Sequence, residues 1–284
     1  MYKSIVLFFC LSVLIFISCE RPDYPEGYVD NGNLVVSVSD IPSVSRLNFV
    51  VYDSIGNRVK QINQLSTDKG FGAAEFQLPA GHYQLVVLGH SSDGNPVLTN
   101  PSKIQFKNNQ GFTDTYLYYD RIDYGASRTQ LPVNLTCIST LCRFVIVDPI
   151  PQNVAKIQFQ YKGGSGAFNA HTGLGCVNSI QTETFPVKAG QDSTYFDLYT
   201  FLQADEGTIS LQTKAFDAND NLITNRDFNI PLERNMMTLV SGNYFDSSYS
   251  GDNTDTPDAP DTSSGLTITV TVNTTWKQDI TINY

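Results

Sequence analysis

Cys19 has the surroundings of a cysteine that is acylated during export. An almost unbroken apolar run, Ile5 to Ile17, precedes it, with Lys3 before the run and the small residue Ser18 after it. As a helix this run reaches only roughly 20 Å, which is too short to cross a hydrocarbon core of about 30 Å. The pattern therefore predicts an export signal over residues 1–18.

The cysteine directly after the small residue separates two kinds of signal. An ordinary secretory site needs no cysteine there, whereas a bacterial lipoprotein site does, because the thiol is acylated before the signal is removed. Phe16 to Cys19 resembles such a lipobox, although leucine is commoner than phenylalanine at its first position. We expect lipidation of Cys19 rather than an incidental cysteine. Several acyl chains would hold the chain at a membrane, since each buried CH₂ contributes about 0.8 kcal/mol.

The acidic balance of the chain argues against nucleic acid as a partner. The sequence has 18 Lys and Arg against 28 Asp and Glu, a net charge of -10, and would repel a polyanion. Its 284 residues, 41% of them hydrophobic and 12% aromatic, supply enough apolar surface for a core and favour two modest domains over one.

Cys137, Cys142 and Cys176 lie beyond the signal and the lipidation site. An odd number of thiols allows at most one internal disulfide. Cys137 and Cys142 would face opposite sides of an alternating strand, so the expected bridge joins Cys176 to Cys137 or to Cys142. The alternative is three buried thiols that pack as small hydrophobes.

Residue patterns of the common catalytic sites are missing. His82, His90 and His171 do not have the spacing of metal ligands, and no nucleophile elbow, Walker loop or dinucleotide fingerprint occurs. The segment DANDN at 217–221 begins like a calcium loop, but Leu222 stands where such a loop needs glycine, which favours a turn. We expect no enzyme activity, no cofactor and no metal site.

Alternating side chains predict a chain that is nearly all β. In residues 156–162, Ile157, Phe159 and Tyr161 face one side, and lysines and glutamines face the other. Other strands are expected at 34–38, 47–51, 83–88, 144–147, 209–213 and 266–272, with turn residues between them. FVVYDSIGNRV and TKAFDANDNLI, at 49–59 and 213–223, share a plan of strand, polar turn and returning strand, which favours two sandwiches in tandem.

The expected organisation has six parts. They are the signal peptide at 1–18, an acidic tether at 19–32, β-sandwiches at 33–127 and 128–246, a flexible acidic linker at 247–265, and a pair of strands at 266–284. The last segment either pairs within the chain, as a hairpin or by completing the second sandwich, or reaches out as a donor strand to a neighbour. Pairing within the chain is favoured, because an exposed apolar strand is an aggregation hazard.

LNFVVYDSIGNRV and FQLPAGHYQLVVLGH resemble the first domain of the fimbrial anchor and minor-subunit lipoproteins of Bacteroidetes-type pili. LPVNLTCISTLCRFVIVDPIPQNVAKIQFQY is similar to the strand pair that opens their second domain. NIPLERNMMTLVSGNYF resembles its closing segment, with Arg234, Asn235 and Gly242 at the expected places.

The resemblance implies two tandem transthyretin-like β-sandwiches after a lipoprotein signal peptide. It also implies a lipid-anchored protein of the outer membrane, exposed at the cell surface, that serves as a fimbrial anchor or accessory subunit in pilus assembly and adhesion. Its partners would be fimbrial shaft or tip subunits, bound by β-strand addition. Ahead of Leu34, Arg21 is the only candidate for a basic cleavage site, which fits an anchor or accessory subunit better than a polymerising one.

A row of tyrosines suggests an alternative function. Tyr116, Tyr118, Tyr119 and Tyr124 could stack on sugars, as in a glycan-binding surface lipoprotein of a polysaccharide-uptake system. Core and interface packing is the other explanation for these side chains, and we favour it.

Overall fold

The structure is a computed structural model that describes residues 33–108 and 111–245, and the backbone of 266–271. Every regular element in these residues is a β-strand, so the predicted all-β fold is confirmed. In the same part of the chain, no helix has the length and apolar character needed to cross a membrane. The predicted signal peptide, the tether with Cys19 and the linker at 247–265 lie outside the described residues.

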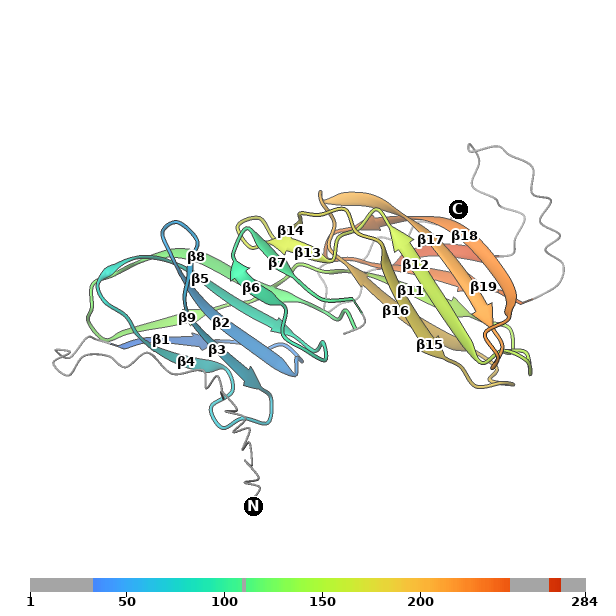
Figure 1. Ribbon diagram of the computed structural model, residues 1–284, viewed down its shortest axis with the longest axis horizontal. Helices are drawn as coiled ribbons and strands as arrows, with labels where there is room; N and C mark the ends of the chain where they lie inside the picture. The colour runs from blue at the N-terminus through green and yellow to red at the C-terminus, as the bar shows by residue number, and fades with distance from the viewer. Residues whose placement is uncertain (1–32, 109–110, 246–265, 272–284) are drawn as a thin grey trace, which may run out of the picture.

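Two sheets form one half of the molecule, which we call the N-terminal lobe (Figure 1). The first sheet has the strand order β4 (Ala73–Gln77), β1 (Asn33–Val38), β9 (Thr129–Val133). The second has the order β10 (Thr136–Cys137), β8 (Tyr116–Tyr124), β5 (Gly81–His90), β2 (Arg46–Asp53), β3 (Arg58–Leu65).

Strands β2 and β5 are buried on both faces, because the second sheet is the middle of three layers. Phe49 and Leu85 pack toward the first sheet, whereas Val50 and Val86 pack in a separate cluster on the opposite face. A third sheet covers that opposite face, with the order β14 (Leu174–Gly175), β13 (Ala167–Asn169), β7 (Lys103–Gln105), β6 (Val97–Asn100).

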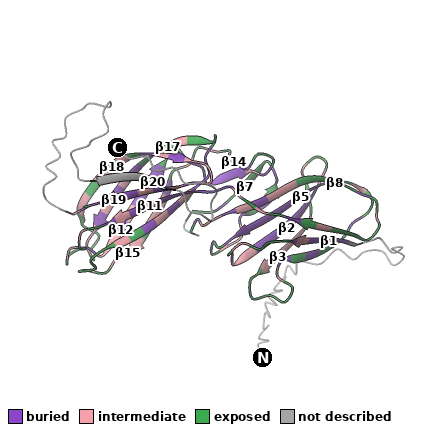
Figure 2. Cartoon of the chain, turned by 180° about the vertical axis from the view of Figure 1, so that it is seen from behind, coloured by how far each residue is buried: buried purple, intermediate pink, exposed green. Residues whose placement is uncertain are grey.

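Two further sheets form the C-terminal lobe (Figure 1). One has the order β16 (Thr194–Thr200), β11 (Thr140–Ile146), β19 (Met237–Gly242), β20 (Leu266–Thr271), and the other β15 (Gln181–Pro186), β12 (Lys156–Lys162), β17 (Glu206–Phe216), β18 (Leu222–Glu233). Phe144, Phe159 and Tyr244 pack in the core of this lobe, and Figure 2 shows the buried residues along its strands. The alternation predicted in β12 is confirmed, since Ile157, Phe159 and Tyr161 are all buried.

Strand pairing does not change at the predicted domain boundary between residues 127 and 128. β9 lies beyond that boundary, yet it pairs in parallel with β1, and β10 pairs with β8. The reason is packing, because Val133 of β9 is buried in the core of the N-terminal lobe. The first strand that pairs within the C-terminal lobe is β11, which begins at Thr140.

The third sheet joins strands from the two predicted sandwiches. β7 comes from the first and β13 from the second, and they pair antiparallel with Phe168 opposite Ile104. Phe168 and Phe201 then pack in the same cluster as Val50 and Val86. The two predicted sandwiches are therefore connected by a shared core rather than by a linker alone.

Candidate functional site

The C-terminal strand β20 belongs to the C-terminal lobe. It pairs antiparallel with β19 along six residues, from Met237 opposite Thr271 to Gly242 opposite Leu266. β19 in turn pairs in parallel with β11, so β19 is an interior strand of its sheet. This is the pairing within the chain that the sequence favoured over a donor strand. The rest of the predicted strand pair, residues 272–284, lies outside the described residues.

β20 forms one edge of its four-stranded sheet, and β16 forms the other. An edge strand presents a row of backbone N–H and C=O groups to which a strand from another chain can pair. Residues 243–265 separate β20 from β19 along the chain, and the backbone ladder with β19 attaches β20 to the sheet. This edge is the first candidate site for a protein partner.

The two related segments at 49–59 and 213–223 have the same turn chemistry. Asp53 accepts hydrogen bonds from the backbone N–H groups of Ile55 and Asn57, at 3.0 and 2.8 Å. Asp217 accepts them from Asn219 and Asn221, both at 2.8 Å. The pKa of Asp217 is lowered by hydrogen bonds from the side chain and then the backbone of Asn221, and that of Asp53 chiefly by the backbone bond from Asn57. DANDN is therefore built as a turn closed by Asp217, which is the interpretation the sequence favoured over a calcium loop.

Cys137, Cys142 and Cys176, the three cysteines within the described residues, are free thiols in the structure. Cys142 is fully buried in the core of the C-terminal lobe, and burial raises its pKa to about 12. Cys137 is half-buried with a pKa raised to about 11 by burial, and Cys176 is exposed. The predicted bridge from Cys176 to Cys137 or Cys142 is not formed in this structure. The alternative expectation was that all three thiols are buried. It is correct for Cys142, but Cys137 is only half-buried and Cys176 is exposed.

The tyrosines of β8 are used in packing. Tyr124 is buried in the core of the N-terminal lobe, and Tyr116 and Tyr118 are partly buried side chains that pack against this core. Tyr119 packs on the opposite face, donates its hydroxyl hydrogen bond to Gln84 Oε1 at 3.0 Å, and has its ring centroid 4.5 Å from that of His171. Packing therefore explains this row, and the stacking surface for sugars that the alternative function needs is not found at these four residues.

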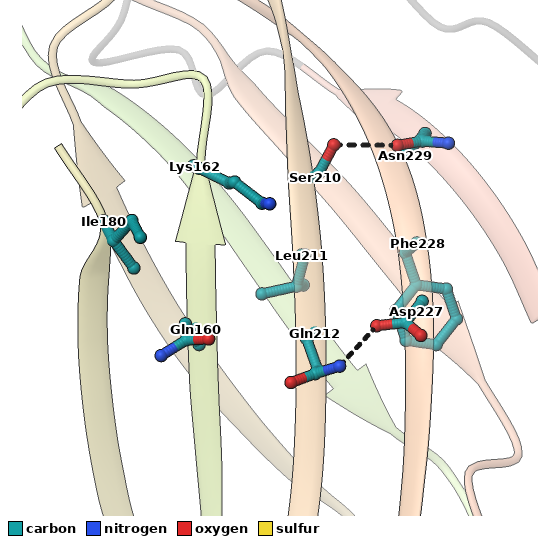
Figure 3. Close-up of a pocket in the computed structure, with 9 residues that line it drawn as sticks. All are labelled: Gln160, Lys162, Ile180, Ser210, Leu211, Gln212, Asp227, Phe228 and Asn229. Atoms are coloured by element: carbon teal, nitrogen blue, oxygen red, sulfur yellow. Dashed lines mark hydrogen bonds between the residues drawn. The ribbon is translucent and has the colours of Figure 1, made fainter. Parts of the chain in front are cut away.

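A hollow lies instead on the outer face of the sheet β15-β12-β17-β18 (Figure 3). Its volume is about 420 Å³, and its lining consists of Gln160, Lys162, Ile180, Ser210, Leu211, Gln212, Asp227, Phe228 and Asn229. Alternation places its six polar side chains on the face opposite the core, because Tyr161 and Leu211 point inward.

The register arranges the polar side chains in two rows of three. Gln160 lies opposite Gln212, which lies opposite Asp227. In the second row, Lys162 lies opposite Ser210, which lies opposite Asn229. Two hydrogen bonds cross between β17 and β18, from Gln212 Nε2 to Asp227 Oδ1 and from Ser210 Oγ to Asn229 Oδ1, both at 3.1 Å (Figure 3).

This array was not predicted from the sequence. The alternation in residues 156–162 indicated the polar side of β12, at Gln160 and Lys162, but not the strands that lie beside it. The signal that was available is the run of polar side chains at alternate positions of residues 208–214 and 225–229. Only the pairing of β12 with β17 and of β17 with β18 brings them together.

Comparison with solved structures gives matches of low sequence identity. A "putative adhesin" from Bacteroides ovatus matches with a TM-score of 0.53 and 16% identity, over 75% of this chain and 87% of that one. "Putative polysaccharide binding proteins" from Bacteroides thetaiotaomicron match with a TM-score of 0.51 and 14% identity, over 88% and 98%. The chain has the fold of these Bacteroides proteins.

The fimbrial anchor protein Mfa2 from Porphyromonas gingivalis also matches, with a TM-score of 0.42 and 12% identity, over 74% of this chain and 89% of that one. No protein-family model matches the chain. No curated protein matches it either. The all-β sandwich fold implied by the resemblance to fimbrial lipoproteins is the fold observed.

Proposed function

We propose that this protein is a surface lipoprotein that acts as an anchor or accessory subunit of a fimbrium, in pilus assembly and adhesion. The observation that carries the proposal is the β19/β20 ladder, in which a strand beyond the acidic segment 246–265 forms the edge of the C-terminal sheet. The fold shared with a "putative adhesin" and the sequence resemblance to fimbrial lipoproteins support it. This function needs no reactive side chain, so we propose that the protein is not an enzyme.

Acyl chains on Cys19 would hold the protein in the outer membrane. The tether at 19–32 would let the N-terminal lobe stand roughly 40 Å from the lipid if it were extended. In this arrangement β1, which starts at Asn33, is the first strand after the tether and lies between β4 and β9. Its two neighbours hold it in the N-terminal sheet, so the lobe is attached to the anchor through a strand inside its fold.

A fimbrial shaft or tip subunit would bind by adding a strand to the C-terminal lobe. It would pair either with the outer edge of β20 or with β19 after replacing β20. In each case the backbone ladder would supply affinity, and alternate side chains would supply specificity. The threonines at 267, 269 and 271 and the apolar residues at 266, 268 and 270 alternate, as this kind of pairing needs.

Two variants of the full chain in cells that assemble the fimbrium test this proposal. Cys19→Ser removes the acylated thiol, and we expect it to leave the outer-membrane fraction while the parent stays there. Deletion of 266–284 keeps the anchor, so we expect this variant to stay in the membrane. Its recovery of shaft subunits in a pull-down should fall if they pair with β20, and should rise if they pair with β19 in place of β20, because the deletion frees that edge of β19. A Cys176→Ser chain is the matched control, because that exposed cysteine lies far from both features in the sequence. Membrane retention of Cys19→Ser, or unchanged recovery of subunits after the deletion, would contradict the proposal.

A further inference from the structure

The hollow on the sheet β15-β12-β17-β18 has the composition of a site that binds through many hydrogen bonds. Its six polar side chains are two glutamines, one asparagine, one serine, one lysine and one aspartate, so their charges sum to zero. Neighbouring strands lie about 4.8 Å apart and alternate residues of a strand about 7 Å apart, so the array measures roughly 10 by 7 Å.

The hydrogen bonds within the array leave atoms that can bind a ligand. Gln212 uses its nitrogen and Asp227 uses one oxygen in their shared bond, so Gln212 Oε1 and Asp227 Oδ2 can each accept from a ligand hydroxyl. Ser210 donates to the carbonyl oxygen of Asn229, so the asparagine nitrogen can donate to a ligand oxygen. The bonds also hold these side chains in place, which lowers the entropy lost on binding.

Other classes of ligand fit this array less well. A polyanion would find one lysine, in an array that also holds an aspartate, on a chain with a net charge of -10. A protein partner usually needs aromatic or arginine anchors at the centre of its interface. Here the apolar lining is Leu211, which is buried, Phe228, which packs against the core, and Ile180, which is 55% exposed at the rim.

We propose that this hollow binds a neutral saccharide of one or two pyranose rings. Vicinal hydroxyls of a sugar both donate and accept, as do the amides of Gln160, Gln212 and Asn229. Asp227 would accept from two neighbouring hydroxyls, and Ile180 would contact a C–H face of the ring. The inference is independent of the fimbrial proposal, since β15, β12, β17 and β18 form a different sheet from β19 and β20.

The test uses the full chain in detergent on an array of neutral, sulfated and uronic-acid oligosaccharides, followed by calorimetric titration with the neutral glycan that binds best. The double variant Asp227→Ala/Asn229→Ala removes the two polar side chains of β18 from the hollow. Asn225→Ala is the matched control, because it is exposed on the same face of β18, two residues before Asp227 and outside the lining. Gln160→Ala probes the array from β12.

We expect the double variant to lose affinity at least tenfold, Gln160→Ala to lose up to about tenfold, and Asn225→Ala to bind as the parent does. All variants alter exposed or half-buried side chains, so equal melting temperatures would show that folding is kept. The proposal is overturned if no neutral glycan binds the parent, if only sulfated or uronic-acid glycans bind, or if the double variant binds as well as the parent. None of these results depends on recovery of fimbrial subunits, so failure here is distinguishable from failure of the fimbrial proposal.

Discussion

The hydroxyl of Tyr161 lies 2.8 Å from Glu183 Oε1 and also 2.9 Å from the carbonyl oxygen of Tyr199. It has one proton for these two acceptors. A protonated Glu183 removes the conflict, because it can donate to Tyr161 Oη while Tyr161 donates to Tyr199. Burial raises the pKa of Glu183 to about 7, although the hydrogen bond from Tyr161 lowers it. At pH 7 this carboxyl is therefore partly neutral, whereas an ordinary glutamate is ionised.

This pair predicts how stability changes with pH. The pKa of Glu183 is higher in the folded state, about 7, than its ordinary 4.5, so its contribution is complete below about pH 4.5 and is lost as pH rises to 7. Glu183→Gln cannot lose a proton. We expect the free energy of unfolding of the parent to fall relative to this variant by roughly 3 kcal/mol between pH 4.5 and pH 8. Urea unfolding at the two pH values measures the difference, and parallel behaviour would contradict the assignment.

The ion pair of Arg143 and Asp197 on the C-terminal lobe is bidentate. Arg143 donates to both carboxylate oxygens, at 2.7 and 2.8 Å, and its guanidinium lies 4.6 Å from the centre of the Tyr195 ring. Both partners are partly buried, so Asp197→Ala should lower the free energy of unfolding by about 1–2 kcal/mol. Asp123→Ala is the control, because Asp123 pairs with His82 at an exposed site, and it should change stability by less than about 0.5 kcal/mol.

In a chain that ends at residue 245, β19 keeps its pairing with β11 but loses β20 on its other edge. The backbone groups of that edge would be exposed to other chains, so we expect a lower melting temperature and self-association in analytical ultracentrifugation. A synthetic peptide of residues 266–284 should restore the melting temperature by binding to β19. The same peptide with Val270→Pro should restore it less, because proline removes a backbone donor. Equal melting temperatures of the truncated and full chains would show that the ladder is not stabilising.

The thiols should differ in reactivity. Cys176 is exposed, whereas Cys142 is fully buried and has a pKa raised to about 12. Because the thiolate is the reactive form, brief alkylation at pH 8 followed by mass spectrometry should label Cys176 well before Cys142, and unfolding should make both react. A native Cys176 that reacts only after reduction would instead show the disulfide to Cys137 or Cys142 that the sequence predicted.

Gly163 directly follows β12 and has a backbone conformation that favours glycine. It has a φ of +98°, and a Cβ there would lie 2.4 Å from the carbonyl oxygen of Thr208. Gly163→Ala should therefore lower the free energy of unfolding by about 2 kcal/mol or more. Gly125 has nothing within 4 Å of an added Cβ, so Gly125→Ala is the control and should have little effect. Similar melting temperatures for the two variants would contradict this account.

Local patterns in the sequence were sufficient for several of the strands and for the turns at Asp53 and Asp217. The alternation of Ile157, Phe159 and Tyr161 predicted the buried face of β12, since side chains of a strand point to opposite faces in turn. Asp53 and Asp217 were recognisable as turn residues because their carboxylates bond to backbone groups only two and four residues away. These interactions involve neighbours in the chain, so the sequence specifies them directly.

The sequence by itself determined that this chain is built of β-strands and that Cys19 is the expected anchor. Only the tertiary structure decided that β9 pairs with β1, that β13 pairs with β7, and that β20 pairs with β19 at the edge of its sheet. It also decided that Gln160, Gln212 and Asp227 share one row. The physical reason is that alternation specifies which face a side chain occupies, whereas the neighbour of a strand is chosen by burial of the whole core and by backbone pairing between distant segments.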